Sequence, residues 1–409
     1  MNTTASYISR LDISATAAPR KVVILGSTGS IGCSALKVLA QHPDKFEVIG
    51  LAGASNAALL AEQAQNWRPA MLGVLDTTVR SAVAQHLPQD YTPQWAIGEA
   101  GYREMAALTE ADLVLSAQVG AAGLPPTVSA IRAGKIVALA NKESLVLAGP
   151  LLRGLCQDFP ACILPVDSEH NAMFQALAGD DLRSLRKLVL TASGGPFRNY
   201  SQKELHQVTP EQALAHPNWS MGAKISIDSS TLMNKGLECI EAAHLFGVAM
   251  DDIEVVVHPE SIVHSLVEYH DGSLLGHLGV PDMQIPIAHC MSYPERLALD
   301  LAPLDLTRLS GLHFTPPDES KFPCLGLARH ALASGPSYPV VLNAANEIAV
   351  ELFLGHELAY LDIARLLDQT LQSHTPVPLP ELESIYEVDA WARRQARHLA
   401  VRSFTASTA

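Results

Sequence analysis

A glycine-rich turn joins the first apolar run of the chain to its first stretch with helical periodicity. The run is KVVIL (21–25), the turn is GSTGSIG (26–32), and the helical stretch is SALKVLAQHP (34–43). Further short apolar runs alternate with amphipathic stretches: FEVIGLAG (46–53), MLGVL (71–75), DLVLSAQ (112–118) and IVALAN (136–141). Strands that alternate with helices indicate βαβ units, and therefore predict a parallel, doubly wound, Rossmann-like sheet.

The turn has the spacing G-x-x-G-x-x-G, with glycines at 26, 29 and 32. Glycines at a strand-to-helix turn allow a tight bend, close approach of a pyrophosphate and tight helix packing, and the helix N-terminus attracts the phosphates. The context predicts a dinucleotide site. The alternative is a turn that is rich in glycine for structural reasons alone.

The second strand ends about twenty residues later, in Gly53-Ala54-Ser55-Asn56. NAD-specific sites usually carry Asp or Glu here to bind the ribose 2′-hydroxyl. A small polar loop instead leaves room for a 2′-phosphate and favours NADP(H), although the loop contains no Arg or Lys. An ordinary β–α turn is the alternative.

The pattern changes after Pro165. Strand-like runs follow at KLVLTAS (187–193), KISIDS (224–229), IEVVVHP (253–259), VHSLVEYHDGS (263–273) and LLGHLGV (274–280). The last two predict a hairpin that turns at Asp271-Gly272, within a second domain that has a mixed or antiparallel sheet. Residues 338–401 contain three stretches with helical spacing.

We therefore expect an α/β chain with an NADPH-binding domain, an α+β catalytic domain and a C-terminal helical domain. The predicted ranges are a flexible N-terminal extension (1–19), the NADPH-binding domain (20–165), the catalytic and metal-binding domain (166–299), a linker (300–325) and the helical domain (326–409).

Charge and composition limit the possible partners. The net charge is −14 and the pI about 5.5, which argues against nucleic acid or an anionic membrane as partner. No run of eighteen apolar residues is present, so no membrane span is expected. The six cysteines form no C-x-x-C pair, which indicates reduced thiols in a cytoplasmic protein. The first twenty residues lack the apolar core of a signal peptide; a transit peptide to a plastid or other organelle is the minor alternative.

Two carboxylates at i and i+2, Asp167 and Glu169, follow Val166. On an extended segment they would share a face, and oxygen ligands suit Mg²⁺ or Mn²⁺. One more carboxylate, such as Glu238, would complete a metal site. The alternative is a helix N-cap before NAMFQALAG, which the spacing alone favours. Histidines 258, 264, 270 and 277 match neither H-E-x-x-H nor a zinc finger, so zinc is not expected.

Three further polar segments stand out. TASGGP (191–196) follows a strand, and its Gly-Gly pair could form an anion-binding nest. HPNWSMG (216–222) could be a lid over a ligand or a connector packed by its tryptophan. DSSTLMNKGLE (228–238) combines hydroxyls, an amide, an amine and a carboxylate before an apolar helix.

Together these segments resemble the 1-deoxy-D-xylulose 5-phosphate reductoisomerase family over roughly residues 20–295. The motifs that carry the resemblance are GSTGSIG, NKES (141–144), PVDSEHNA (165–172), TASGGPF, HPNWSMG, DSSTLMNKGLE and HPESIVHS (258–265). The resemblance implies rearrangement of 1-deoxy-D-xylulose 5-phosphate and its reduction with NADPH to 2-C-methyl-D-erythritol 4-phosphate, in the non-mevalonate isoprenoid route. It also implies a divalent metal (Mg²⁺, Mn²⁺ or Co²⁺), inhibition by fosmidomycin-type hydroxamates at that metal, and a homodimer.

The resemblance assigns roles by motif. The implied metal ligands are Asp167, Glu169 and Glu238. With Lys142 and His216 they form the implied catalytic group. The implied substrate contacts are Lys142, Ser168, Glu169, Ser193, His216, Trp219, Met221, Ser229, Asn234, Lys235 and Glu238. Of these, Trp219 and Met221 would lie on a closing flap, and Ser193, Ser229, Asn234 and Lys235 would hold the phosphate and neighbouring oxygens. The implied NADPH contacts are Thr28, Gly29, Ser30, Ile31, Gly53, Ala54, Ser55, Asn56, Asn141, Glu143 and Gly222.

The sequence departs from the family pattern in the ribose-side loop. Ala54 stands where the family has glycine, and Ser55 stands where some members have lysine. Two other functions remain as alternatives. Another NADP-dependent dehydrogenase, of the semialdehyde or homoserine type, would leave the carboxylates of 167–169 and 238 without a task. A non-catalytic nucleotide-sensing module would leave several buried charges unpaired.

Overall fold

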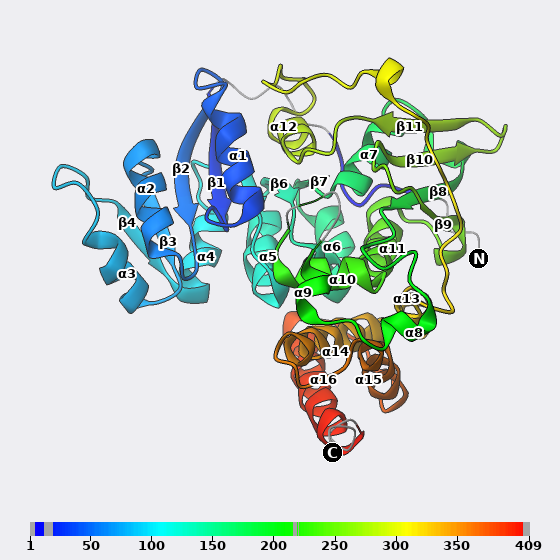
Figure 1. Ribbon diagram of the computed structural model, residues 1–409. Coiled ribbons are helices and arrows are strands. Elements are labelled where there is room, and N and C mark those ends of the chain that lie inside the picture. The colour runs from blue at the N-terminus through cyan, green and yellow to red at the C-terminus, as the bar shows by residue number, and fades with distance from the viewer. Residues whose placement is uncertain (1–4, 12–18, 216–218, 220, 404–409) are drawn as a thin grey trace.

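The computed structural model describes residues 5–11, 19–215, 219 and 221–403. Figure 1 shows two sheets side by side, with the C-terminal helices packed below them. This arrangement confirms the predicted fold class. The domain borders given above remain a prediction.

The first sheet has seven strands in the order β4-β3-β2-β1-β5-β6-β7, and all its strand pairs are parallel. The strands are β1 (Arg20–Leu25), β2 (Phe46–Ala52), β3 (Met71–Val74), β4 (Gln94–Ile97), β5 (Leu113–Ser116), β6 (Ile136–Leu139) and β7 (Cys162–Pro165). The helices between them are α1 (Ser30–Ala40), α2 (Ala57–Trp67), α3 (Thr77–Ala84), α4 (Gly98–Ala106), α5 (Leu124–Arg132) and α6 (Lys142–Asp158). Five of the strands were predicted. The two missed strands, β4 and β7, have four residues each and lie at the two edges.

The second sheet has the order β11-β10-β8-β9, with β8 and β9 parallel and the other pairs antiparallel. Its strands are β8 (Leu185–Ala192), β9 (Ile253–Val257), β10 (Val263–Tyr269) and β11 (Leu274–Leu278). The sheet is mixed, and β10 and β11 form the predicted hairpin, where Gly272 has φ +86°. The accompanying helices are α7 (Ser168–Ala176), α8 (Gln202–Leu205), α9 (Pro210–Leu214), α10 (Ala223–Ser230), α11 (Met233–Phe246) and α12 (Gln284–Ser292).

The prediction of a strand at KISIDS (224–229) is wrong, because these residues lie in α10. Alternation of polar and apolar residues suggested a period of two. In the helix, however, Lys224 pairs with Asp228 one turn later at 3.1 Å. The hydroxyl of Ser226 also donates to the Gly222 carbonyl at 3.0 Å. Local pairs at i and i+4 therefore favour the helix over the strand.

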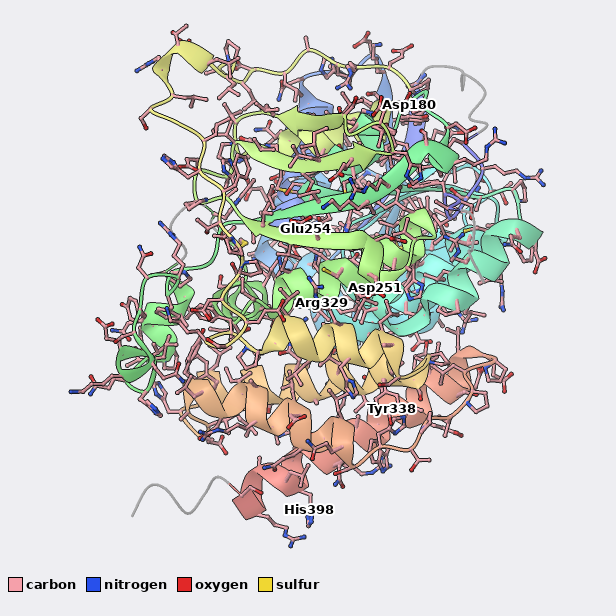
Figure 2. The ribbon with its side chains drawn as sticks, turned by 90° about the vertical axis from the view of Figure 1, so that its right-hand side faces the viewer. Asp180, Asp251, Glu254, Arg329, Tyr338 and His398 are labelled. Carbon is pink, nitrogen blue, oxygen red and sulfur yellow. The ribbon has the colours of Figure 1, made fainter. Side chains whose placement is uncertain are left out.

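The C-terminal part is helical, as predicted. Its helices are α13 (Cys324–Ala333), α14 (Ser337–Leu354), α15 (Tyr360–Gln372) and α16 (Leu382–Ser403). Figure 2 views the molecule from the right-hand side of Figure 1, with the second sheet facing the viewer and these helices below it. Helix α14 is buried along most of its length and packs against α15, α16 and α6. Within the described residues, no helix is long and apolar enough to cross a membrane.

Residues 5–11 pack against the body of the protein, which differs from the flexible extension expected for 1–19. The backbone N–H of Ile8 donates to the Leu245 carbonyl at 2.8 Å. The Tyr7 hydroxyl donates to the Ile163 carbonyl at 2.9 Å. This segment therefore contacts both β7 of the first sheet and α11.

Candidate active site

The glycine turn lies between β1 and α1, at the carboxyl ends of the parallel strands. Gly26 has φ +89°, and a Cβ atom there would lie 2.4 Å from the Ala117 carbonyl oxygen. A Cβ atom at Gly32 would lie 2.4 Å from the Gly26 carbonyl oxygen. Gly29 is more exposed, at the N-cap of α1. The first and third glycines therefore shape the turn, and the second leaves backbone N–H groups open to a ligand.

The other predicted nucleotide residues divide into two groups. Glu143 and Gly222 line the same cavity as Gly29, Ser30 and Ile31. Asn141 is buried, caps α6 and donates to the carbonyls of Gln118 and Gly120 at 2.8 and 3.0 Å. It shapes the loop after β5 and does not itself line the cavity. The second group, residues 28 and 53–56, lies outside the cavity lining. Thr28 lies against Gly53, and Asn56 caps α2. Ala54 and Ser55 lie between Gly53 and Asn56 in the chain.

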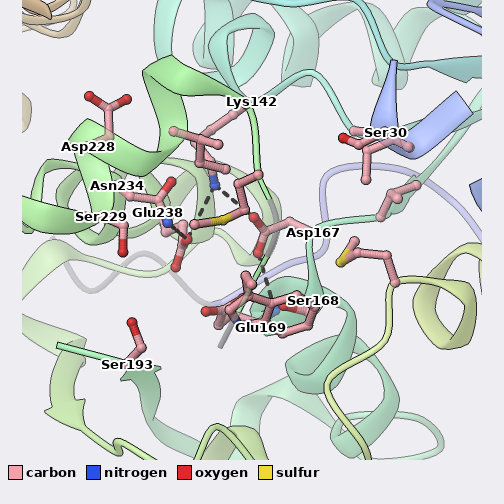
Figure 3. A pocket seen from close by; sticks show the side chains of 18 of the residues that line it. Ser30, Lys142, Asp167, Ser168, Glu169, Ser193, Asp228, Ser229, Asn234 and Glu238 are labelled. Carbon is pink, nitrogen blue, oxygen red and sulfur yellow. Dashed lines mark hydrogen bonds and ion pairs between the residues drawn. The ribbon is translucent and has the colours of Figure 1, made fainter. Parts of the chain in front are cut away.

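One cavity of about 580 Å³ brings the predicted site together. Figure 3 shows Ser30 on one side of it and Ser193 and Ser229 on the opposite side, with Asp167, Glu169 and Glu238 between them. Every predicted substrate and metal residue that the structure describes lines this cavity: Lys142, Asp167, Ser168, Glu169, Ser193, Trp219, Met221, Ser229, Asn234, Lys235 and Glu238. His216 lies outside the described residues.

Three carboxylates come together at the centre of the cavity. One oxygen from each of Asp167, Glu169 and Glu238 lies within 4.8 Å of the other two, a grouping that could hold a metal ion. The two lysines contact the same carboxylates. Lys142 Nζ lies 2.7 Å from Asp167 Oδ2 and 3.4 Å from Glu238 Oε1. Lys235 Nζ lies 2.7 Å from Glu169 Oε1 and also bonds to Glu238.

Asp167 is also a helix cap. Its Oδ1 accepts hydrogen bonds from the backbone N–H groups of Glu169 and His170 at the start of α7. Its Oδ2 faces Lys142. The cap and the metal-ligand interpretations of the D-S-E sequence are therefore compatible, because one carboxylate uses its two oxygens for two purposes.

The acidic cluster contains a fourth carboxylate that the sequence analysis did not single out. Glu241 lies on α11 one turn after Glu238, is 3% exposed, and has Oε2 3.1 Å from Lys142 Nζ. Burial raises the pKa of Glu238 and of Glu241 to about 7 each, with Glu169 adding to the effect on Glu238. For Asp167, burial is outweighed by the attraction and hydrogen bond of Lys142 together with the attraction of His170 and Lys235, which hold the pKa well below its usual range.

The opposite end of the cavity is built from hydroxyls and glycines. Gly194 and Gly195 have φ +78° and +68°, the left-handed backbone that an anion-binding nest uses. A Cβ atom at Gly195 would lie 2.8 Å from the Ser229 carbonyl oxygen. This close contact brings the backbones of the TASGGP and DSSTLM segments together at this end of the cavity. Lys235, which was expected at the phosphate end, contacts the carboxylates in this structure.

Among the charged residues that line the cavity, sequence reasoning also missed Lys224 and Asp228. Their i, i+4 spacing was the available signal, but the strand prediction for 224–229 concealed it. For Glu241, the signal was its position three residues after Glu238, within a helix that is otherwise largely apolar.

Models of three protein domains match the chain: 1-deoxy-D-xylulose 5-phosphate reductoisomerase (residues 22–149), the reductoisomerase C-terminal domain (163–246), and the DXP reductoisomerase C-terminal domain (278–395). The 1-deoxy-D-xylulose 5-phosphate reductoisomerase of Oleidesulfovibrio alaskensis is 56% identical over 386 residues, which cover 93% of this chain and 95% of the relative. The chain belongs to the 1-deoxy-D-xylulose 5-phosphate reductoisomerase family.

Solved reductoisomerase structures agree with this chain over nearly their full length. The enzyme from Zymomonas mobilis, in complex with NADPH, has a TM-score of 0.88 and 43% identity, with 94% of this chain and 100% of that chain covered. A reductoisomerase in complex with NADPH, fosmidomycin and magnesium also has a TM-score of 0.88, with 42% identity and coverage of 93% and 98%.

Proposed function

We propose that this chain is a 1-deoxy-D-xylulose 5-phosphate reductoisomerase that rearranges its substrate and reduces the product with NADPH to 2-C-methyl-D-erythritol 4-phosphate. The observation that carries the proposal is the order of groups within one cavity. A glycine turn before a helix N-terminus lies on one side, three carboxylates lie in the middle, and a glycine nest with two serines lies opposite.

A divalent metal fits the central cluster. Asp167, Glu169, Glu238 and Glu241 supply four carboxylates, whereas Lys142 and Lys235 supply two ammonium groups. When all six groups are ionised, the four carboxylates and two ammonium groups leave a net charge of −2, which a divalent cation would balance. The oxygen-only ligands Asp167, Glu169 and Glu238 suit Mg²⁺ or Mn²⁺. When bound, such a metal polarises substrate oxygens and stabilises negative charge on them.

The remaining residues would hold the substrate in place. The hydroxyls of Ser193 and Ser229 and the N–H groups of the glycine nest would bind its phosphate, which anchors the molecule at a distance from the reacting carbons. The buried Asn234 Oδ1 has no hydrogen-bond partner among the described residues, so it can accept from a substrate hydroxyl. Lys142 would supply a positive charge beside the reacting oxygens.

NADPH would bind with its pyrophosphate at the N-terminus of α1 and its nicotinamide toward the carboxylates, where it supplies the hydride. Ser30, Ile31 and Glu143 would line that path. The ribose-side loop contains no Arg or Lys. Ser55, Asn56 and backbone N–H groups of α2 would therefore bind the 2′-phosphate of NADPH.

An assay with the purified protein, 1-deoxy-D-xylulose 5-phosphate, NADPH and Mg²⁺ tests the proposal. We expect oxidation of NADPH that a chelator abolishes, and 2-C-methyl-D-erythritol 4-phosphate as the product. No turnover with substrate and metal both present would exclude the proposed activity. A dehydrogenase of the semialdehyde or homoserine type is not favoured, because the family models match the acidic and serine segments as well as the nucleotide domain.

We also propose that the chain forms a homodimer in the cytoplasm. The relatives from Oleidesulfovibrio alaskensis and Nitratidesulfovibrio vulgaris are bacterial proteins. The edge strand β11 exposes Leu274, Leu275 and Leu278 at 56%, 45% and 43%. An exposed apolar edge strand is suited to pairing with a second copy. Light scattering on the purified protein would measure the assembly.

A further inference from the structure

Lys224 forms a charged bridge between two elements of the site. Its Nζ lies 3.1 Å from Glu143 Oε1 and 3.1 Å from Asp228 Oδ2. Its side chain is 20% exposed, and those of Glu143 and Asp228 are 8% and 2% exposed. Ion pairs this well buried are held in defined geometry and are costly to break from one side.

The Glu143 side of the bridge leads to the nucleotide loops and to Lys142. Glu143 lies in the first turn of α6, directly after Lys142, the first residue of that helix. Its Oε2 accepts from Asn141 Nδ2 at 3.1 Å. Asn141 in turn binds the carbonyls of Gln118 and Gly120 in the loop after β5. A shift of Glu143 would therefore move both Lys142 and the loop that borders the nucleotide turn.

The Asp228 side leads to the phosphate end and to the C-terminal helices. Asp228 precedes Ser229 on α10. Its Oδ1 accepts from Asn346 Nδ2 on α14 at 2.7 Å, within a buried contact. Asn346 is fully buried and does not line the cavity. Through Asp228, the helical domain therefore contacts the residue next to a predicted phosphate ligand.

The charges around Lys224 argue that it does not bind an anionic ligand directly. Its ammonium group already has two carboxylate partners. Burial would lower the pKa of Lys224, but Asp228, Glu143 and Glu347 outweigh burial and raise it above its ordinary value. The lysine is thus permanently charged and already neutralised by its neighbours. Such a group fixes the positions of other elements more effectively than it attracts a phosphate.

We propose that Lys224 is a positioning residue that sets the spacing between α6, which begins with Lys142, and α10, which carries Ser229, so that nucleotide and substrate bind at the correct separation. This inference rests on the proposed function, because it assigns Lys224 a role in the two binding steps. Asp228 and Asn346 complete the same connection from the helical domain.

The first test replaces Lys224 with Met and with Arg, and measures KM and kcat for both substrates together with the dissociation constant of NADPH. For Lys224→Met we expect both KM values to rise about tenfold or more, because small misplacements of binding groups have effects of this size. The value of kcat should change less than the KM values. Lys224→Arg should recover most of the loss, since it keeps the charge.

The second test changes a residue outside the cavity, so it can be carried out even when Lys224→Met fails to fold. Asn346→Ala removes the hydrogen bond to Asp228 and should raise the same KM values in the same direction, by a smaller factor. The matched control is Ser337→Ala on the same helix. Ser337 is also fully buried, and its hydroxyl contacts His374 at 2.9 Å rather than Asp228. The control should alter thermal stability and leave both KM values unchanged.

Unchanged KM values in Lys224→Met would overturn the inference. So would a loss confined to kcat, which would indicate direct participation in the chemistry, or an Asn346→Ala variant that behaves like Ser337→Ala. The assay of the wild-type protein distinguishes failure of the proposed function from failure of this inference. If it oxidises no NADPH with the pentulose phosphate and metal present, the function itself is excluded before any variant is compared.

Discussion

Lys142 Nζ lies 3.1 Å from Glu241 Oε2, a carboxylate outside the predicted set of metal ligands. The other carboxylates that contact Lys142 are Asp167 and Glu238, both predicted ligands. If a metal were bound by those two groups, Glu241 would be the carboxylate that remains for the lysine. Figure 3 shows Lys142 directed at the acidic cluster from the side of α6.

Replacing Glu241 with Gln should therefore impair catalysis through Lys142. A hydrogen bond to a charged group contributes about 1.5–3 kcal/mol, so we expect kcat/KM to fall roughly tenfold to a hundredfold. Metal affinity should be reduced much less than by Glu238→Gln. A suitable control is Glu254→Gln, which removes an ion pair to Lys187 on the surface of the second sheet (Figure 2). Wild-type kcat/KM in Glu241→Gln would contradict the assignment.

Glu238→Gln should abolish tight metal binding and turnover while NADPH binding survives. Glu238 is 1% exposed and shares the metal-binding group with Asp167 and Glu169, whereas the glycine turn lies on the far side of the cavity. Titration with Mn²⁺ and with NADPH would measure the two affinities separately. Glu169→Gln should behave in the same way. Turnover at the wild-type rate in either variant would refute the metal assignment.

Metal binding should depend on pH near neutrality. Because the pKa values of Glu238 and Glu241 are raised to about 7, the cluster holds protons below pH 7 that a divalent cation has to displace. Affinity should weaken as the pH falls from 8 to 6, by up to about tenfold per unit for each proton released. It should level off above pH 8. Calorimetry in two buffers of different ionisation enthalpy would count the protons, and a pH-independent affinity would contradict the expectation.

The sequence predicted the parts of the structure that depend on local pattern. Alternating strands and helices gave the parallel sheet, and the Asp271-Gly272 turn gave the hairpin. The carboxylates of 167–169 and 238 come from segments about seventy residues apart in sequence. Residue chemistry could suggest Glu238 as a third metal ligand, and the resemblance to family motifs implied it, but spacing could not show that the three groups meet. Lys224 was assigned to the wrong element, because a short alternating segment fits a strand as well as a helix. Its contact with Glu143, and the contact of Asp228 with Asn346 on α14, join segments far apart in sequence and could not be inferred from spacing.

Asp167 offers a prediction that separates its two roles. Its carboxylate caps α7 with one oxygen and faces Lys142 with the other. Asp167→Asn keeps an oxygen that can accept from the N–H groups of Glu169 and His170 but removes the charge, whereas Asp167→Ala removes both. Both variants should lose metal affinity and turnover.

The two variants should differ in stability. Loss of an N-cap acceptor costs about 1 kcal/mol, so Asp167→Ala should unfold at a lower temperature than Asp167→Asn. The lost contact with Lys142 is common to both variants and cancels in this comparison. Thermal unfolding without added metal is the appropriate measurement, because bound metal would stabilise the wild-type protein alone. Equal stability of the two variants would mean that the cap contributes little. Wild-type Mg²⁺ affinity in Asp167→Asn would remove Asp167 from the ligand set and leave it as a cap alone.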